Sequence, residues 1–183
     1  MVYKETEIPG VWIIEPKVYA DERGYFFEAY KEKEFEEKMG RVHFMQDNES
    51  CSASGVLRGL HYQLEPYSQS KLVRVIQGKV LDVAIDIRKG SPTFGKYIAV
   101  ELTGENKRQL FIPKGFAHGF YVMSERAVFT YKVDNPYNPQ FERCIRFDDP
   151  SICIDWPINK IVISDKDRNA PLLCDAENNF EYI

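Results

Sequence analysis

Short runs of apolar and β-branched residues alternate with turn residues along most of the chain. Turn signals such as 89–92 (KGSP) and Asn135-Pro136 separate the runs. Regularly spaced short strands of this kind predict an all-β sandwich or barrel. The predicted strands are 11–19, 24–30, 55–63, 71–87, 96–102, 109–116, 127–133 and 144–147.

Two segments have a helical pattern. The residues from Lys31 to Met39 are rich in charge and are followed by Gly40, a common helix terminator. Ser164 suits the N-cap of a second, short helical turn. Since no repeat, low-complexity segment or linker interrupts the chain, we expect a single domain over residues 1–183.

The composition limits the classes to which the protein can belong. Hydrophobic residues at 44% and aromatic residues at 14% are typical of a globular protein. A net charge of −4, from 24 basic and 28 acidic residues, argues against a nucleic-acid-binding face. No apolar run approaches the ~20 residues of a membrane span, and the N-terminus lacks a signal-peptide pattern, so we expect a cytoplasmic protein. The cysteines show no CxxC spacing and are expected to be free thiols: Cys51, Cys144, Cys153 and Cys174.

The stretch GVLRGLHYQ (55–63) places polar residues in a strand pattern. In a regular strand Arg58 and His61 would face opposite sides of the sheet. Gly59 lies between them, and a glycine inside a strand often marks a bulge. A bulge would bring both side chains to one face. The alternative is that Arg58 lies on the surface while His61 faces inward, and periodicity does not decide between the two.

Further polar residues stand in or beside other apolar strand runs. Burying such groups without partners costs kilocalories each, so they satisfy one another or face a wet cavity. We therefore predict a polar pocket inside the barrel. Histidines occur only at 43, 61 and 118, without a His-x-His pair, so no metal site is expected. The polar residues are Gln46, Asp47, Asn48, Lys71, His118 and Tyr131.

Eight motifs resemble one known family over nearly the whole chain, from about Ile8 to Leu173. They are DERGYFFE (21–28), FMQDNES (44–50), GVLRGLHYQ (55–63), KLVRVIQGKVLDVAIDIR (71–88), SPTFG (91–95), IPKGFAHGF (112–120), YKVDNPYNPQFE (131–142) and SDKD (164–167). The chain resembles the dTDP-4-dehydrorhamnose 3,5-epimerases of dTDP-L-rhamnose biosynthesis. The resemblance implies a cupin-type jelly-roll barrel (a double-stranded β-helix), a homodimer, and no metal or other cofactor.

The family inverts carbons 3 and 5 of dTDP-4-dehydro-6-deoxy-D-glucose, which yields dTDP-4-dehydro-L-rhamnose. The resemblance implies that His61 is the base, because imidazole accepts a proton near neutral pH. Asp167 would orient the His61 ring, although its neighbour Asp165 could be mistaken for it. Tyr131 would be the acid on the opposite face of the sugar, and Lys71 would stabilise the enolate.

The same resemblance implies a set of substrate-binding residues. Arg23 and Glu28 would reach the site of a neighbouring subunit, and Tyr137 would stack on the thymine ring. Arg58 suits the diphosphate because its planar fork binds two oxygens. The chain departs from the family pattern at Glu49, a position at which many relatives carry histidine. The remaining binding residues are Gln46, Asp47, Asn48, His118, Glu142 and Lys166.

Three other functions fit parts of the pattern. A monoepimerase would act at carbon 3 or carbon 5 alone, on a related 4-keto-6-deoxy sugar nucleotide. A non-catalytic cupin sugar-binding module would have lost a catalytic group, whereas His61, Lys71, Tyr131 and Asp167 are all present. A metal-dependent cupin oxygenase would need a histidine cluster. The sequence does not determine which nucleotide base the substrate carries or which deoxysugar is the final product.

Overall fold

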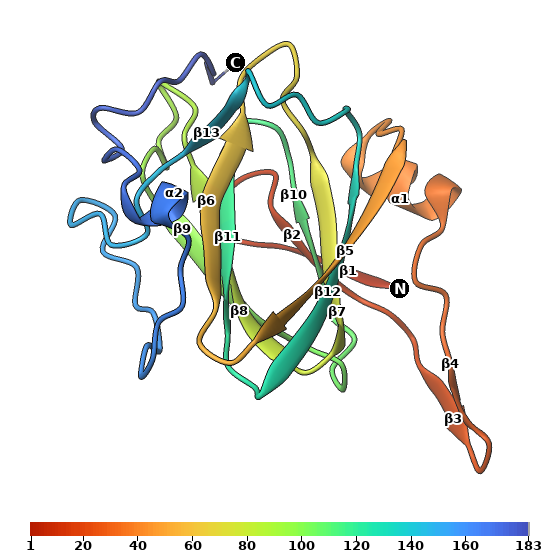
Figure 1. Cartoon of the computed structure of the whole chain (residues 1–183). Coiled ribbons are helices and arrows are strands. Elements are labelled where there is room, and N and C mark those ends of the chain that lie inside the picture. The colour runs from red at the N-terminus through yellow and green to blue at the C-terminus, as the bar shows by residue number, and fades with distance from the viewer. Residues whose placement is uncertain (183) are drawn as a thin grey trace.

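The computed structural model describes residues 1–182 and leaves Ile183 outside the description. Two antiparallel sheets form the body of the molecule (Figure 1). The first contains, in spatial order, β1 (Val2–Glu5), β2 (Trp12–Glu15), β10 (Gln109–Ile112), β7 (Lys71–Gln77), β12 (Arg126–Val133) and β5 (Gln46–Ala53). The second contains β13 (Glu142–Cys144), β6 (Leu57–Gln63), β11 (Phe116–Val122), β8 (Lys79–Asp86) and β9 (Tyr97–Thr103).

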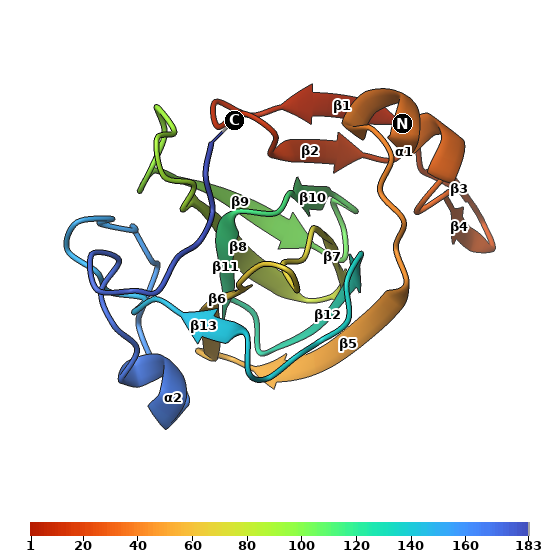
Figure 2. The same cartoon turned by 90° about the horizontal axis from the view of Figure 1, so that it is seen from above.

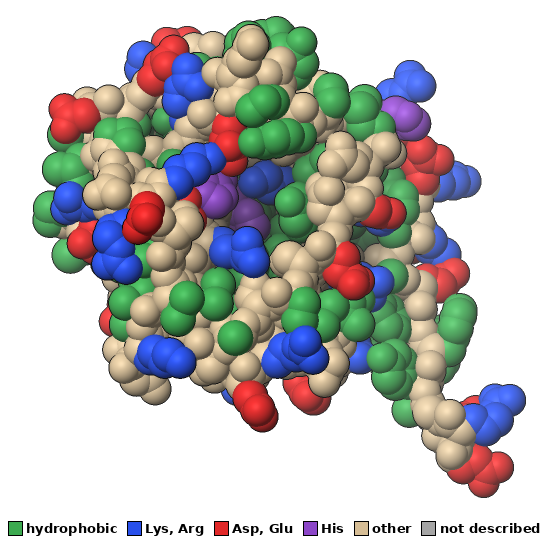
Figure 3. Space-filling model, in the orientation of Figure 1, with side chains coloured by type: hydrophobic (Ala, Val, Ile, Leu, Met, Phe, Trp, Pro, Cys, Tyr) green, Lys and Arg blue, Asp and Glu red, His purple; other side chains and the backbone are tan. Residues whose placement is uncertain are grey.

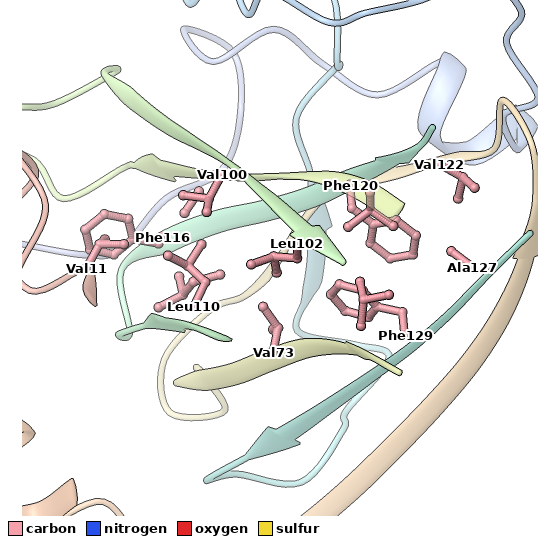
Figure 4. Packing of buried hydrophobic residues seen from close by; sticks show 14 of the residues in the cluster. Val11, Val73, Val100, Leu102, Leu110, Phe116, Phe120, Val122, Ala127 and Phe129 are labelled. Atoms are coloured by element: carbon pink, nitrogen blue, oxygen red, sulfur yellow. The ribbon is translucent and has the colours of Figure 1, made fainter. Parts of the chain in front are cut away.

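The two sheets face each other and close into a barrel when seen from above (Figure 2). Alternate residues of their strands point inward, and they pack into one apolar cluster between the sheets (Figure 4). Val73 and Phe129 come from the first sheet, and Leu102 and Phe120 from the second. The Phe120 and Phe129 rings stack at 4.3 Å between centroids. The predicted all-β barrel is confirmed.

Both outer faces of the barrel are covered. The helix α1 (Glu32–Met39) places Phe35 against Leu72 and Phe111 on the outside of the six-stranded sheet. The C-terminal segment packs Ile152 and Phe180 against the outside of the five-stranded sheet. A separate hairpin of β3 (Tyr19–Asp21) and β4 (Gly24–Phe26) projects from the body (Figure 1). No helix within residues 1–182 is long and apolar enough to cross a membrane.

Most predicted elements are present, with shorter bounds. The predicted helix at 31–39 is α1, and Ser164 caps the second helix, α2 (Asp165–Arg168), by accepting the Asp167 amide hydrogen. The predicted strand 71–87 is two strands joined at Gly78, where a positive φ of +84° permits the tight turn. The predicted strand 144–147 is wrong for residues 145–147, because β13 ends at Cys144. The Arg146 amide donates to the Pro171 carbonyl instead of to a neighbouring strand.

Candidate active site

A β-bulge shapes the strand that carries Arg58 and His61. Two residues separate them on β6, but only one residue separates their partners on β11. Gly59 lies in this bulge with φ +133°, and a Cβ there would come within 2.5 Å of the Gly119 Cα. Only glycine fits such a close approach. Arg58 and His61 consequently line the same cavity, which confirms the predicted bulge.

This cavity, of about 180 Å³, lies between the two sheets. In Figure 3 histidine side chains are visible at the bottom of a hollow, with Lys and Arg side chains around it. The cavity is the polar pocket that the sequence predicted inside the barrel. Its polar lining comes from both sheets: Arg58, His61 and His118 from the five-stranded sheet, and Glu49, Lys71 and Tyr131 from the six-stranded one.

His61 is held by a buried carboxylate from α2. Its Nε2 lies 2.7 Å from Asp167 Oδ1, and the Gly59 amide donates to Asp167 Oδ2. Burial by itself would raise the pKa of Asp167, but the hydrogen bonds from His61, Gly59 and Ser164 outweigh it and hold that pKa below its ordinary value. Asp167 is therefore ionised at neutral pH and orients the ring. Asp165, the neighbouring acid, is exposed.

Lys71 and Tyr131 stand across the cavity from His61, on neighbouring strands. Burial lowers the pKa of Lys71 to about 8, against the opposing charges of Asp82 and Glu142. The ammonium is thus largely protonated at pH 7. Burial raises the pKa of Tyr131, although the charge of Arg58 opposes the shift. The Tyr131 hydroxyl therefore keeps its proton at neutral pH and can donate it.

A second His–Asp pair lies at the bottom of the cavity. His118 Nε2 is 2.8 Å from Asp82 Oδ1, and both residues are buried. Burial lowers the pKa of His118, with the Asp82 carboxylate opposing that effect. We did not predict Asp82 as a site residue from the sequence. Its signal was a carboxylate within the apolar run VLDVAIDI (80–87), where an acid needs a partner.

Three of the predicted binding residues meet at one edge of the barrel. The Tyr137 hydroxyl donates to Glu142 Oε2 at 2.8 Å, and the Lys166 ammonium donates to the same oxygen. Tyr137 itself is 55% exposed, so its ring is available for stacking. Glu142 thereby holds an aromatic face and a cation next to each other.

The polar residues of β5 divide between its two faces. Asn48 pairs with Tyr131 in register, so both point to the same side of the sheet. The Gln46 amide donates to Asn48 Oδ1 at 2.8 Å on that side. Asp47 points the other way and forms an ion pair with Lys132 at 2.8 Å. Asp47 therefore lies on the outer face of the barrel, beside a hollow lined by Tyr30 and Arg74 among others.

The chain does not bring Arg23 and Glu28 to its own cavity. Arg23 forms an ion pair with Asp21 at 2.6 Å in the β3–β4 hairpin, which projects away from the barrel (Figure 1). Glu28 follows the hairpin and pairs with Lys31 at 2.7 Å. Neither residue therefore lines the cavity of its own chain.

Among residues 1–182, one group of three side chains has the spacing of a metal site: His61, Cys144 and Asp167. The Cys144 thiol donates to Asp167 Oδ1 at 3.8 Å, and burial raises its pKa to about 12. Asp167 Oδ1 is also bonded to His61 Nε2. The three side chains are therefore joined to one another through Asp167. The described cysteines form no disulfide.

An all-β barrel with a His–Asp pair, a lysine and a tyrosine around an inner cavity defines a cupin-type protein equipped for acid–base chemistry. The chain belongs to the dTDP-4-dehydrorhamnose 3,5-epimerase family, whose model matches residues 5–175. It is 59% identical over 174 residues to the dTDP-4-dehydrorhamnose 3,5-epimerase of Shigella flexneri, covering 94% of this chain and 96% of that one.

Solved structures show the same fold. The dTDP-6-deoxy-D-glucose-3,5-epimerase of Legionella pneumophila, in complex with dTDP-4-keto-L-rhamnose, superimposes with a TM-score of 0.92 at 52% identity, covering 95% of this chain and 93% of that one. A 3'-monoepimerase of Streptomyces bikiniensis, in complex with dTDP-quinovose, gives a TM-score of 0.88 at 33% identity, covering 92% and 86%. The predicted cupin-type jelly roll is confirmed, as is the resemblance to the family.

Proposed function

We propose that the protein epimerises carbons 3 and 5 of dTDP-4-dehydro-6-deoxy-D-glucose to give dTDP-4-dehydro-L-rhamnose, in the cytoplasm, as a step of dTDP-L-rhamnose biosynthesis. The observation that carries this proposal is the arrangement of the cavity. The His61–Asp167 pair enters from one sheet, and Tyr131 and Lys71 enter from the other. A sugar held between the sheets would have a base on one face and an acid on the other.

His61 removes the proton in this mechanism. Its Nε2–H donates to Asp167, so the lone pair of the neutral ring is on Nδ1. The hydrogens on carbons 3 and 5 are acidic because both carbons neighbour the ketone at carbon 4. The C–H bond breaks as Nδ1 takes the proton, and Asp167 stabilises the imidazolium. A positioned base of this kind contributes about 10²- to 10⁴-fold.

Lys71 and Tyr131 complete each inversion. The electrons of the broken C–H bond move onto the carbon 4 oxygen, where the Lys71 ammonium stabilises the enolate. The Tyr131 hydroxyl then protonates the carbon from the opposite face. The tyrosinate recovers a proton from solvent, and the His61 imidazolium releases its proton to solvent. The same cycle at the second carbon completes the double epimerisation.

The sugar nucleotide is held by polar groups around the cavity. The Arg58 Nε–H donates to Ser52 Oγ at 3.1 Å, which fixes the guanidinium plane. Its terminal nitrogens suit two diphosphate oxygens. We assign Tyr137 to the thymine ring and Lys166 and Glu142 to polar contacts near it. The binding set further includes His118, Gln46, Asp47 and Asn48.

Proton NMR in heavy water tests the reaction. The proposal expects deuterium at carbons 3 and 5 of dTDP-4-dehydro-6-deoxy-D-glucose with the wild type, and at neither carbon with His61→Ala. The matched control is His43→Ala, because His43 is exposed and lies outside the cavity. Exchange at one carbon alone would favour a monoepimerase, the activity named for the Streptomyces bikiniensis neighbour. Ligand binding without exchange would favour a sugar-binding module.

We also propose that the protein works as a homodimer in which Arg23 and Glu28 complete the partner's site. The support is the projecting hairpin, whose Tyr25 and Phe26 side chains are 58% and 66% exposed. Mixing Arg23→Ala protein with His61→Ala protein tests this. A mixed dimer has one site with both native residues, so activity should reappear although each variant alone is impaired. Mixtures that are no more active than the sum of their parts would refute the shared site.

A further inference from the structure

Tyr137, whose ring is assigned to the thymine, lies in an irregular segment between β12 and β13. Among residues 1–182, no backbone–backbone hydrogen bond holds residues 135–137. The Tyr137 hydroxyl donates to Glu142, which fixes one end of the side chain. A ring that is held in its binding position before the ligand arrives binds more tightly, because less ordering is needed. The backbone end of Tyr137 therefore needs an anchor of its own.

That anchor is the side chain of Gln63, the last residue of β6 and of the motif GVLRGLHYQ. Gln63 is buried, and its Oε1 accepts the backbone N–H of Asn138 at 2.6 Å. Its Nε2 donates to the Pro136 carbonyl at 3.2 Å and to the Tyr67 carbonyl at 2.7 Å. One side-chain amide thus binds the backbone on both sides of Tyr137.

The three bonds define the orientation of the Gln63 amide. Both hydrogens of its nitrogen are directed at carbonyl oxygens, and its oxygen faces an N–H group. The opposite orientation would place Oε1 against two carbonyl oxygens and would lose all three bonds. Because burying an amide without partners is costly, these bonds favour one position of the segment around Tyr137.

Strand β6 connects this anchor to the catalytic base. Gln63 and His61 are two residues apart on β6, so their side chains point to the same face of the sheet. Gln63 also pairs in register with Glu142 on β13. The strand pair β6–β13 therefore holds Tyr137 at both ends, at its backbone through Gln63 and at its hydroxyl through Glu142.

We propose that Gln63 is a positioning residue of the nucleotide site, whose amide holds Tyr137 where its ring stacks on the base. Gln63 does not line the cavity that contains His61, so it acts through Tyr137 and not on the sugar. The inference rests on the proposed function for the assignment of Tyr137 to the thymine ring. Because one strand carries both Gln63 and His61, it sets the spacing between the bound base and the reacting sugar.

The binding of two probes tests this proposal without turnover. Calorimetry gives the Kd of dTDP, which carries the base, and the Kd of inorganic pyrophosphate, which does not. Gln63→Met fills a similar volume but cannot make the three bonds. It should raise the Kd of dTDP by at least about threefold, as part of the about 5- to 150-fold rise that loss of the ring in Tyr137→Ala should cause. The Kd of pyrophosphate should not change. Equal losses for the two probes, or an unchanged Kd of dTDP, would overturn the proposal.

Asn179→Ala is the matched control for a general loosening of the loop after β6. Asn179 is exposed, and its side chain accepts from the Glu65 backbone amide at 3.1 Å and donates to the Glu65 carbonyl at 3.2 Å. It thus fastens this loop by two bonds to backbone groups far from Tyr137 in sequence. The control should leave both dissociation constants in place. A loss of dTDP binding as large as in Gln63→Met would contradict a specific role for Gln63.

A second variant covers the case in which Gln63→Met does not fold. Gln63→Glu keeps the shape of the side chain and an oxygen for the Asn138 N–H, but it cannot donate to both carbonyls. It should weaken dTDP binding in the native background and have no effect in Tyr137→Ala, because the ring that it positions is then absent. An equal effect in both backgrounds would indicate that the new charge repels the diphosphate, and would contradict the proposal.

The reaction gives a separate readout. Because the diphosphate separates the base from the reacting carbons, Gln63→Met should raise KM and leave kcat unchanged. A fall in kcat with an unchanged KM would contradict the proposal. If the wild type exchanges deuterium and Gln63→Met binds dTDP equally well, this inference fails and the proposed function stands. If no epimerisation occurs but dTDP binding depends on Gln63 as expected, the proposed function fails and this inference stands.

Discussion

Replacing Asp167 by asparagine isolates the contribution of the His61 partner. The asparagine Oδ1 can still accept the His61 Nε2–H, which lies 2.7 Å from the native carboxylate. The negative charge is lost, however, so the imidazolium formed after proton abstraction has no counter-charge. We therefore expect the ring to keep its orientation and the reaction to slow.

The magnitude follows from the burial and the length of this hydrogen bond. The Asp167 side chain is only 5% exposed in its pair with His61, so solvent screens the pair weakly. Hydrogen bonds to charged groups contribute about 1.5–3 kcal/mol. At about 1.4 kcal/mol per factor of ten, the loss in kcat/KM is about 10- to 150-fold.

The assay is the rate of deuterium incorporation at carbons 3 and 5 in heavy water. Asp165→Asn is the matched control, because Asp165 stands two residues away on α2 and is exposed. It should keep at least half of the wild-type rate. Equal losses in the two variants, or a rate for Asp167→Asn within threefold of the wild type, would refute the assignment of Asp167.

Three further predictions follow from the cavity. Because Lys71 must be protonated to stabilise the enolate and has a pKa of about 8, kcat/KM should fall as the pH rises through that value. A pH profile of Lys71→Arg, whose cation does not titrate there, should lack this fall. Gly59→Ala should lower the free energy of unfolding by about 2 kcal/mol, because the alanine Cβ would lie 2.5 Å from Gly119 Cα at a position with positive φ. Calorimetry should then show a Tm lower by about 4–8 °C. EDTA should leave kcat/KM unchanged, because the proposed steps use only protein side chains such as His61 and Tyr131; a loss restored by one added metal would contradict this.

The strand pattern predicted much of the barrel because its apolar and turn residues are local signals. The polar β5 (Gln46–Ala53) was not among the apolar runs, since it is an edge strand whose pairing with β12 depends on tertiary contacts. β1 is a four-residue edge strand that is mostly exposed and has little apolar pattern. The glycine at position 59 suggested the bulge, because a glycine inside a strand often marks one, but periodicity left open whether Arg58 faces the surface. The register between β6 and β11 decides for the bulge.

Less of the candidate site than of the fold could be predicted from the sequence alone. The motifs identified His61 and Asp167, although 106 positions separate them, because a known family carries both. No local rule predicts that the Asp82 carboxylate reaches His118, since that contact joins two strands through their register. The positions of Arg23 and Glu28 depend on the hairpin leaving the barrel, which strand propensity does not determine.

The central claim is that a base and an acid act from opposite sides of the sugar. Tyr131→Phe in heavy water tests it most directly, because it removes the acid and leaves the His61–Asp167 pair intact. The account predicts that deuterium still enters next to the ketone through His61, while formation of the inverted product falls at least a hundredfold. Inverted product formed at the wild-type rate, or loss of exchange with loss of inversion, would contradict it.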